Sequence, residues 1–397
     1  MPSRVLIFTG TRAEAGLLAP VARACAENKS LRASWLVSGT HALQGHGDTL
    51  DDVRQSGVEV AETVPFFSSP DQAHGHPLHT LASDMGKGLA RLADALDALK
   101  PGWLVVLGDR VESFAAASAA FALRIPVAHL HGGDRIESGH MDEAFRHAIT
   151  RFAALHFAAS EGSAERLRKF GEEEWRIHMT GAPGLDRLSA LKSAIAGRER
   201  QVLSRHGVPA DARLLLVIFH PVSAELGSME SQAHELFGAL DARPEHKLAI
   251  FPNNDPGHEA IEAALLKRQA EPRWSVERNL GPESYAAAMS VASAFVGNSS
   301  SGVIEAPLFG LPFVHIGTRN QGREQAGHVV FVTPVERMAI DAAISQATRP
   351  EAHERVAKLI NPYGSGDCGQ KVARLLEAFS DQSHPMHSRL LHKRVAY

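Results

Sequence analysis

The sequence predicts an α/β protein built from two doubly wound parallel-sheet domains. Short apolar runs alternate with amphipathic helical segments along most of the chain, the order expected of parallel sheets that carry helices on both faces. The alternation pauses at a charged, helical stretch at 187–207 and then starts again. Polar clusters follow the apolar runs in both halves, and ligands of such sheets bind beyond the carboxyl ends of the strands. We therefore expect a single cleft between the two domains to hold the functional site.

The first predicted domain covers residues 1–186. The run at 4–8 is continuously apolar, as expected of a strand in a parallel sheet covered on both faces. The strands of this domain are expected at 4–8, 34–38, 58–64, 103–107, 127–130, 154–158 and 177–180. Helices are expected between them at 13–28, 78–99, 111–123, 142–153 and 161–170.

The second predicted domain covers residues 187–367. Its strands are expected at 214–219, 247–251, 274–276, 292–296, 313–316 and 329–332. Its helices are expected at 232–240, 258–269, 283–292, 303–309 and 337–348. A last helix within about 368–384 is expected to pack back on the first domain, and the tail after Ser380 is expected to be loose.

Length and composition exclude several classes of protein. A chain of 397 residues is too long for one ordinary core, and 44% hydrophobic with 22% charged residues is typical of a globular protein. The net charge of −4 gives no basic surface for nucleic acid or for a membrane. Cys25 and Cys368 fit no metal spacing and suit a reducing compartment. The N-terminal apolar run is a first strand and not a signal peptide, so we expect a cytoplasmic protein.

The stretch 297–324, GNSSSGVIEAPLFGLPFVHIGTRNQGRE, predicts a phosphate site. A buried strand, a serine- and glycine-rich turn and a helix N-terminus present unpaired N–H groups and a favourable helix dipole to an anion. Glu305 is expected in the first turn of the helix at 303–309, and Arg319 and Arg323 follow as fork-shaped donors. An ordinary strand–helix turn with a solvated arginine pair is the alternative.

Carboxylates and histidines at strand ends are the candidates for acid/base chemistry. Carboxylates gathered in a closing cleft can have pKa values that are pushed apart, which gives one acid and one base. The carboxylates in question are Asp109, Asp134 and Asp142, with Glu112, Glu137 and Glu143 nearby in the sequence. For each of them a helix cap or surface charge is the alternative; Asp142 in particular could be the N-cap of its helix, with Arg146 as a surface partner.

Among the histidines, His131 adjoins Gly132 and Gly133 and is expected in the cleft, whereas His129 is expected to pack in the sheet. His220 precedes Pro221, which keeps its backbone extended and its ring free to face the cleft. His147 is expected to be a packing or capping residue. No HxxxH or HExxH spacing occurs, so no metal site is expected, and the glycine fingerprint of a dinucleotide site is missing after the first strand.

These motifs together resemble one family. In chain order they read GTRAEAGLLAP, GDRVES, HLHGGD, MDEAFRHAIT, TGAPGLD, His220-Pro221, FPNNDPG, GNSSSGVIEAPLFGLP and GTRNQGRE, from about Val5 to Val332. This series resembles the hydrolysing UDP-N-acetylglucosamine 2-epimerases of sialic and legionaminic acid biosynthesis. Ala13 after GTR and the NSSSG segment look like the hydrolysing branch, since the non-hydrolysing branch usually has proline after GTR.

The resemblance implies a GT-B-like pair of Rossmann-like domains with the active site in the interdomain cleft. It implies anti elimination of UDP from a UDP-2-acetamido sugar through a 2-acetamidoglycal, then hydration to a free manno-configured sugar. The resemblance implies no metal or redox cofactor. It implies a homodimer or a homotetramer. Asp109 and Asp142 would be acid/base carboxylates, and His220 would assist the departing diphosphate. With strand-end neighbours included, the substrate- and UDP-binding residues would be Arg12, His41, Asn253, Ser299, Ser300, Ser301, Glu305 and Arg319.

One position departs from the family pattern. His131 stands where the family often carries a glutamate, so His131, Asp134 or Glu137 could be the general acid. The HxHGG form resembles a subgroup that acts on UDP-2,4-diacetamido-2,4,6-trideoxy sugars, which leaves that substrate and UDP-N-acetylglucosamine both open. A GT-B glycosyltransferase and a non-catalytic sugar-nucleotide-binding regulator are the alternative functions.

Overall fold

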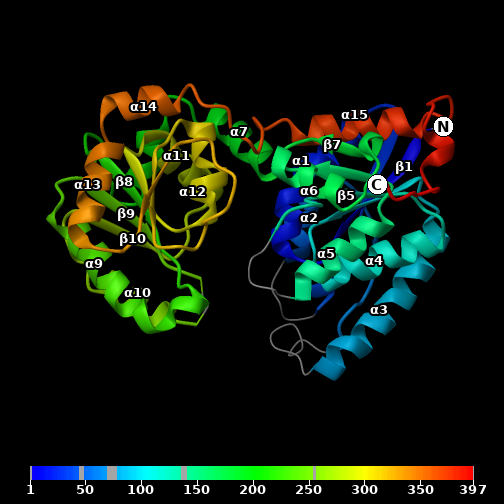
Figure 1. Cartoon of the computed structure of the whole chain (residues 1–397), viewed down its shortest axis with the longest axis horizontal. Helices are drawn as coiled ribbons and strands as arrows, with labels where there is room; N and C mark the ends of the chain where they lie inside the picture. Colours follow the sequence, from blue (N-terminus) through cyan, green and yellow to red (C-terminus); the bar gives the residue numbers. More distant parts are fainter. Residues whose placement is uncertain (1, 44–48, 69–77, 136–140, 254–255, 397) are drawn as a thin grey trace. The chain divides into compact units, whose positions relative to one another are not determined.

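The computed structural model describes residues 2–43, 49–68, 78–135, 141–253 and 256–396 (Figure 1). The chain divides into two compact units. The first comprises Met1–Arg187 and Tyr363–Tyr397, and the second comprises Leu188–Pro362. The chain therefore leaves the first unit within a helix and returns to it for its C-terminal segment.

The first unit is built on a parallel sheet that has seven strands within the described residues, in the order β3-β2-β1-β4-β5-β6-β7. The strands are β1 (Ser3–Thr9), β2 (Leu31–Val37), β3 (Val60–Thr63), β4 (Trp103–Leu107), β5 (Val127–Leu130), β6 (Leu155–Ala158) and β7 (Ile177–Met179). The helices are α1 (Arg12–Glu27), α2 (Thr49–Arg54), α3 (Leu78–Leu99), α4 (Val111–Ala122), α5 (Met141–Phe152), α6 (Glu161–Lys169) and α15 (Cys368–Ser380), and α7 (Gly184–Ala194) crosses into the second unit. The order of the strands reverses between β1 and β4, which makes that position the switch point of the sheet.

Alternate residues of β1 show how the first sheet is covered. Val5 and Ile7 pack in a core that includes residues of α1 and α15, whereas Leu6 and Phe8 pack in a second core with residues of α3 and α4. Successive side chains of a strand point to opposite faces, so the two cores lie on opposite faces of the sheet. Figure 1 shows α15 running along α1, and these two helices are in contact.

The second unit repeats this plan with a parallel sheet of six strands within the described residues, in the order β10-β9-β8-β11-β12-β13. The strands are β8 (Leu214–Ile218), β9 (His246–Ile250), β10 (Trp274–Glu277), β11 (Ala294–Gly297), β12 (Phe313–Ile316) and β13 (Val329–Val332). The helices are α8 (Glu199–Ser204), α9 (Met229–Ala242), α10 (His258–Leu266), α11 (Pro282–Val291), α12 (Ser300–Ile304), α13 (Arg337–Ala347) and α14 (Pro350–Val356). The switch point lies between β8 and β11. The prediction of two doubly wound parallel sheets is therefore confirmed.

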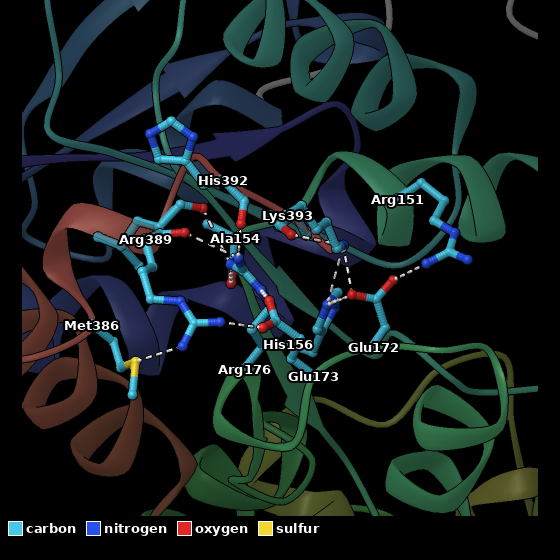
Figure 2. A network of polar contacts seen from close by, with 12 residues as sticks. Arg151, Ala154, His156, Glu172, Glu173, Arg176, Met386, Arg389, His392 and Lys393 are labelled. Atoms are coloured by element: carbon cyan, nitrogen blue, oxygen red, sulfur yellow. Dashed lines mark hydrogen bonds and ion pairs between the residues drawn. The ribbon is translucent and has the colours of Figure 1, made fainter. Parts of the chain in front are cut away.

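The prediction of a loose C-terminal tail is wrong for the residues that the structure describes. Arg176 is fully buried, and its guanidinium donates hydrogen bonds to three tail carbonyls, those of Arg389 (3.0 Å), Leu390 (3.1 Å) and His392 (3.1 Å) (Figure 2). Lys393 forms an ion pair with the buried carboxylate of Glu172 at 2.7 Å. Because these partners lie far away in the sequence, the charged and polar tail is held on the first unit in a way that its own composition does not reveal.

Candidate functional site

The turns after β1, β4 and β5 carry the candidate site residues of the first unit. These strands are adjacent and parallel, and in register Leu107 pairs with Leu130 near the carboxyl end of β4 and β5. The segment after β1 therefore lies at the same edge of the sheet as Asp109 and His131. The sequence prediction that these strand ends meet at one edge agrees with this arrangement.

Asp109 and Arg146 are the centre of a charged cluster at this edge. Arg146 lies on α5, its side chain is only 5% exposed, and its guanidinium forms an ion pair with Asp109, which is 18% exposed. The same guanidinium donates to Glu143 Oε2 at 2.8 Å and to the carbonyl of Asp134 at 2.7 Å. Arg146 is thus a buried residue that holds Asp109, Glu143 and the backbone of Asp134 together at this edge, and it is not a surface partner of Asp142.

The pKa of Asp109 is raised above its ordinary value. Burial is the main cause, and the negative charges of Asp142 and Glu143 add to it, while Arg146 works in the opposite direction. Asp142 lies within the first turn of α5, which begins at Met141, so the alternative that Asp142 is the N-cap of this helix is not supported. A partly buried carboxyl whose pKa is raised, and which lies among further carboxylates, is a candidate for a group that takes up and releases a proton.

His131 and Asp134 form a second pair at the end of β5. His131 Nδ1 lies 2.8 Å from Asp134 Oδ2, and Ser163 Oγ donates to Asp134 Oδ1 at 2.7 Å. Burial disfavours the charged form of Asp134, but His131 and Ser163 outweigh it, and the pKa of Asp134 is about 2. Asp134 is therefore a fixed carboxylate and a poor general acid. His131 has a left-handed backbone (φ 60°), an uncommon conformation for a residue with a side chain that is often found at functional sites. Glu137, the third candidate, lies outside the described residues.

The two other histidines of this region have different surroundings. His129 is fully buried, its Nε2 lies 2.7 Å from the carbonyl of Gly108, and burial lowers its pKa to about 3. A neutral ring that donates to this carbonyl supports the turn before Asp109. His147 stacks on Phe170 with 5.1 Å between the ring centroids and lines a cavity of about 340 Å³ beside Glu143.

The turn after β1 contains Arg12 and also Glu14, a residue of this edge that the sequence prediction missed. Thr11 caps α1, and Glu14 Oε2 accepts from Gly10 N at 2.7 Å and from Thr11 N at 3.1 Å, which completes a capping box. Glu14 is buried, and burial together with the neighbouring charge of Glu112 raises its pKa to about 7. The spacing of Thr11 and Glu14 is the capping-box signal that could have identified this contact.

Two more side chains complete this edge. Arg12, the first residue of α1, is exposed. His41 is buried, and its Nε2 lies 3.2 Å from the hydroxyl of Thr9. The ring of His41 therefore helps to hold the end of β1.

In the second unit, candidates lie in the turns after β8, β9, β11 and β12. Asn298 joins them: its amide bonds to the backbone of His220, and its own carbonyl accepts from Arg319 Nη1 at 3.2 Å. Asn253 is exposed, and its backbone N–H donates to His220 Nδ1 at 3.3 Å. The carboxyl-end edge of this sheet thus brings His220, Asn253 and Arg319 together around Asn298.

The serine turn differs from its prediction in the position of the helix. The expected helix at 303–309 is wrong: α12 begins at Ser300 and ends at Ile304, and a 3-10 turn, η5 (Ala306–Phe309), follows. The helix begins early because Ser299 Oγ accepts from Ser301 N, and the α-helix ends before Pro307, which lacks an N–H group.

Glu305 therefore lies at the C-terminal end of α12 and not in its first turn. Its Oε2 accepts a hydrogen bond from the hydroxyl of Tyr285 at 2.8 Å, and burial raises its pKa. At that end the helix dipole does not favour a carboxylate, so the expected position of Glu305 in the first turn of the helix, beside the anion site, is wrong. Arg323, the second arginine of that stretch, is exposed.

Within the described part of the chain, no helix is both long and apolar enough to cross a lipid bilayer. Comparison with known proteins identifies related chains that match all or most of this chain. The hydrolysing UDP-N,N'-diacetylbacillosamine 2-epimerase of Legionella pneumophila is 31% identical over 397 residues, which is 100% of both chains. The UDP-N-acetylglucosamine 2-epimerase of Neisseria meningitidis is 32% identical over 344 residues, 87% of each chain.

A solved structure supports the fold. The crystal structure of a UDP-GlcNAc 2-epimerase from Neisseria meningitidis, bound to UDP-GlcNAc, matches with a TM-score of 0.75 at 21% identity and covers 94% of this chain and 99% of that one. This likeness confirms the predicted GT-B-like fold class. The sequence pattern of the family described as UDP-N-acetylglucosamine 2-epimerase matches residues 23–377. The chain therefore belongs to the UDP-N-acetylglucosamine 2-epimerase family.

Proposed function

We propose that this chain is a hydrolysing 2-epimerase that converts a UDP-2-acetamido sugar into UDP and a free manno-configured sugar. The substrate that we propose is UDP-2,4-diacetamido-2,4,6-trideoxyglucose, with UDP-N-acetylglucosamine as the alternative. Two observations support this order: the full-length Legionella relative bears the bacillosamine name, and His131 stands in the HxHGG form.

The observation that carries the proposal is the cluster around Asp109. Epimerisation at C2 requires a group that takes the C2 proton and a group that returns a proton to the opposite face. Asp109 has a raised pKa and lies beside Arg146 in a cluster whose other acidic members, Asp142 and Glu143, influence its charge. His131, held by the fixed carboxylate of Asp134, offers a second exchangeable proton at the same edge.

The proposed reaction has two steps. In the first, a carboxylate takes the C2 proton, the C2–H electrons form the C1=C2 double bond of a 2-acetamidoglycal, and the C1–O bond breaks so that UDP leaves with its electron pair. In the second, a proton is delivered to C2 from the opposite face and the oxygen of water bonds to C1 while losing its own proton. One water is consumed, and no electrons are gained or lost overall. We assign the proton transfers to Asp109, Asp142 and His131.

The proposal assigns nucleotide binding to the strand-end polar groups that the family resemblance implies. Arg12 and Arg319 are exposed guanidinium groups, which bind phosphate oxygens in a fork-like geometry. His220 would donate to the departing diphosphate. The remaining proposed substrate- and UDP-binding residues are His41, Asn253, Ser299, Ser300, Ser301 and Glu305. Of these, Glu305 keeps a weaker physical basis, because its carboxylate already accepts from Tyr285.

The proposal is tested by incubating the protein with each UDP-sugar separately, without an acceptor, in heavy water. We expect release of UDP and a free sugar that carries deuterium at C2, measured by ³¹P and ¹H NMR. Turnover of UDP-N-acetylglucosamine alone would exclude the bacillosamine substrate. An epimerised sugar that is still attached to UDP would exclude hydrolysis, and UDP release only after an acceptor is added would indicate a glycosyltransferase.

Asp109→Asn connects the activity to the cluster. The amide keeps the shape of the side chain but cannot exchange the proton, so we expect UDP release to fall by a factor of roughly 100 or more. The matched control is Asp341→Asn, since Asp341 also forms an ion pair with an arginine, Arg243, but on α13 of the second unit. Undiminished UDP release by Asp109→Asn would show that the assigned acid/base chemistry is wrong.

A further inference from the structure

Asn298 follows β11, at the switch point of the second sheet, where the backbones of two strands approach closely. Gly297 has φ 140°, and a Cβ atom on it would lie 1.9 Å from the carbonyl oxygen of Ile218 at the end of β8. Only glycine permits this approach. The backbone N–H of Asn298 then donates to the same Ile218 carbonyl at 3.1 Å. Asn298 is thereby placed directly beside His220.

The side chain of Asn298 continues the pairing of the two strands. Its Oδ1 accepts from the backbone N–H of His220 at 2.7 Å, and its Nδ2 donates to the carbonyl of His220 at 2.8 Å. The two bonds close a ring between an amide and a peptide unit, so they fix the position and the rotation of that backbone. Pro221 limits His220 to extended conformations. Asn298 is only 1% exposed, so water cannot readily replace these bonds.

The backbone carbonyl of Asn298 serves the turn after β12. It accepts from Asn320 Nδ2 at 2.7 Å and from Arg319 Nη1 at 3.2 Å. Asn320 is itself 2% exposed. One buried residue therefore connects His220, after β8, with Arg319, after β12. The side chain makes the first connection and the main chain makes the second, so a substitution at this position can separate them.

We propose that Asn298 is a positioning residue for the elimination step, acting through its side chain on His220. The proposal rests on the proposed function in one respect, namely that His220 assists the departing diphosphate. Asn298 itself touches only the backbone of His220 in this connection, so its effect on turnover passes through the direction of the imidazole ring. Its main-chain contribution to nucleotide binding, through Arg319, does not depend on the side chain.

The test is a double-substitution cycle with His220→Ala and Asn298→Ala. Asn298→Ala removes both bonds to His220 and keeps the carbonyl that accepts from Arg319. We expect kcat to fall by roughly 10- to 100-fold, since small displacements of a reacting group have effects of this size, while the Kd for UDP changes less than about twofold. In the His220→Ala background the same substitution should change kcat by less than about twofold. Independent, multiplicative effects of the two substitutions would overturn the proposal.

A matched control separates positioning from general stability. Asn361 lies in the same unit, and its Nδ2 donates to the carbonyl of Ile304 at 2.9 Å, so Asn361→Ala also removes an amide bond to the main chain. We expect kcat of Asn361→Ala to remain within about twofold of the unsubstituted protein. If Asn298→Ala does not fold, Asn298→Asp replaces it in the cycle, because the carboxylate keeps the bond from His220 N–H and loses only the donor to the carbonyl.

A spectroscopic measurement distinguishes failure of this inference from failure of the proposed function. The imidazole ¹⁵N signals of His220 are identified by their absence in His220→Ala. They should shift in the Asn298 variant and remain unchanged in Asn361→Ala. If no UDP-sugar is turned over, the proposed function fails, and these signals alone decide whether Asn298 positions the ring of His220. Unchanged His220 signals in the Asn298 variant would overturn it whatever the activity.

Discussion

Glu14→Gln should change how the stability of the first unit depends on pH. The glutamine oxygen can still accept from the N–H groups of Gly10 and Thr11, which Glu14 Oε2 does at 2.7 and 3.1 Å. The substitution therefore keeps the shape of the turn and removes one ionisable group. What it removes is a buried carboxyl whose pKa is raised from 4.5 to about 7, mainly by burial and next by the charge of Glu112.

The sign follows from the unfolded chain, in which this carboxyl ionises near its ordinary pKa of 4.5. Between that pH and about 7 the unfolded chain loses the proton while the folded chain still holds it, so unfolding is favoured progressively as pH rises. At about 1.36 kcal/mol per pKa unit, the full effect is about 3 kcal/mol, and roughly 2–3 kcal/mol of it falls between about pH 5 and pH 8. Glu14→Gln lacks this loss, so its stability relative to the unsubstituted protein should rise by that amount over this range.

The assay is urea unfolding from pH 5 to pH 8, followed by tryptophan fluorescence. Trp35, Trp103 and Trp175 lie in the first unit and Trp274 in the second, so a Trp274→Phe background reports the first unit alone. Separate observation of one unit matters because a chain with two units need not unfold in one step. Any loss of hydrogen-bond strength in the variant is independent of pH and cancels from the slope.

The exposed Asp97 on α3 provides the control, since Asp97→Asn removes a carboxyl from the surface of the same unit. Its unfolding free energy should follow that of the unsubstituted protein across the pH range. Parallel curves for Glu14→Gln and the unsubstituted protein would refute the reasoning, because they would mean that Glu14 ionises alike in the folded and the unfolded chain.

Three further predictions concern other parts of the molecule. Arg176→Ala should release the tail, because it removes the donors to the tail carbonyls, and should lower the free energy of unfolding by roughly 3–5 kcal/mol. Trypsin should then cleave the last residues rapidly, and an uncleaved tail would contradict this. Gly297→Ala should prevent correct folding of the second unit, measured as a Trp274 fluorescence emission like that of the unfolded chain. Gly227→Ala should leave the emission unchanged, because a Cβ at Gly227 meets nothing within 4 Å. Asp134→Asn should reduce kcat about tenfold, because His131 loses its charged partner, and an unchanged pH profile would argue against that role.

Local patterns in the sequence were sufficient for the sheets, since most strands are short apolar runs and every expected strand lies in one of two parallel sheets. They were also sufficient to place Asp109 and His131 at one edge, because the carboxyl ends of adjacent parallel strands meet there. The end of the helix before Glu305 could have been predicted from the sequence. Pro307 lies inside the expected helix at 303–309, and proline in that position ends an α-helix before it.

Contacts between distant residues could not be predicted in this way. Arg146 is separated from Asp109 by helix α4, strand β5 and the start of α5. Nothing in the sequence around Arg146 distinguishes it from an ordinary helix-surface arginine. The tail is a similar case. Its charged residues are typical of a solvated end, and the partners that hold Lys393 are distant in the sequence: the buried carboxylate of Glu172, paired with His156, and the carbonyls of Thr150 and Ala153.

The switch points of the two sheets have a feature in common that explains why buried polar side chains form hydrogen bonds to the backbone there. We call these contacts polar ties. Neighbouring strands at a switch point send their following helices to opposite faces, so the backbone groups just beyond the strands have no helix above them and require other partners. In the first unit Glu14 supplies acceptors to the turn after β1 and reaches Ser113 of α4 at 3.3 Å. In the second unit the side chain of Asn298 provides an acceptor and a donor to the backbone of His220. Both ties are buried and lie next to groups to which we assign chemistry. The crevice that opens for a ligand at a switch point is thus also the place where the protein must add its own buried polar side chains, and these fix the direction of the groups around it.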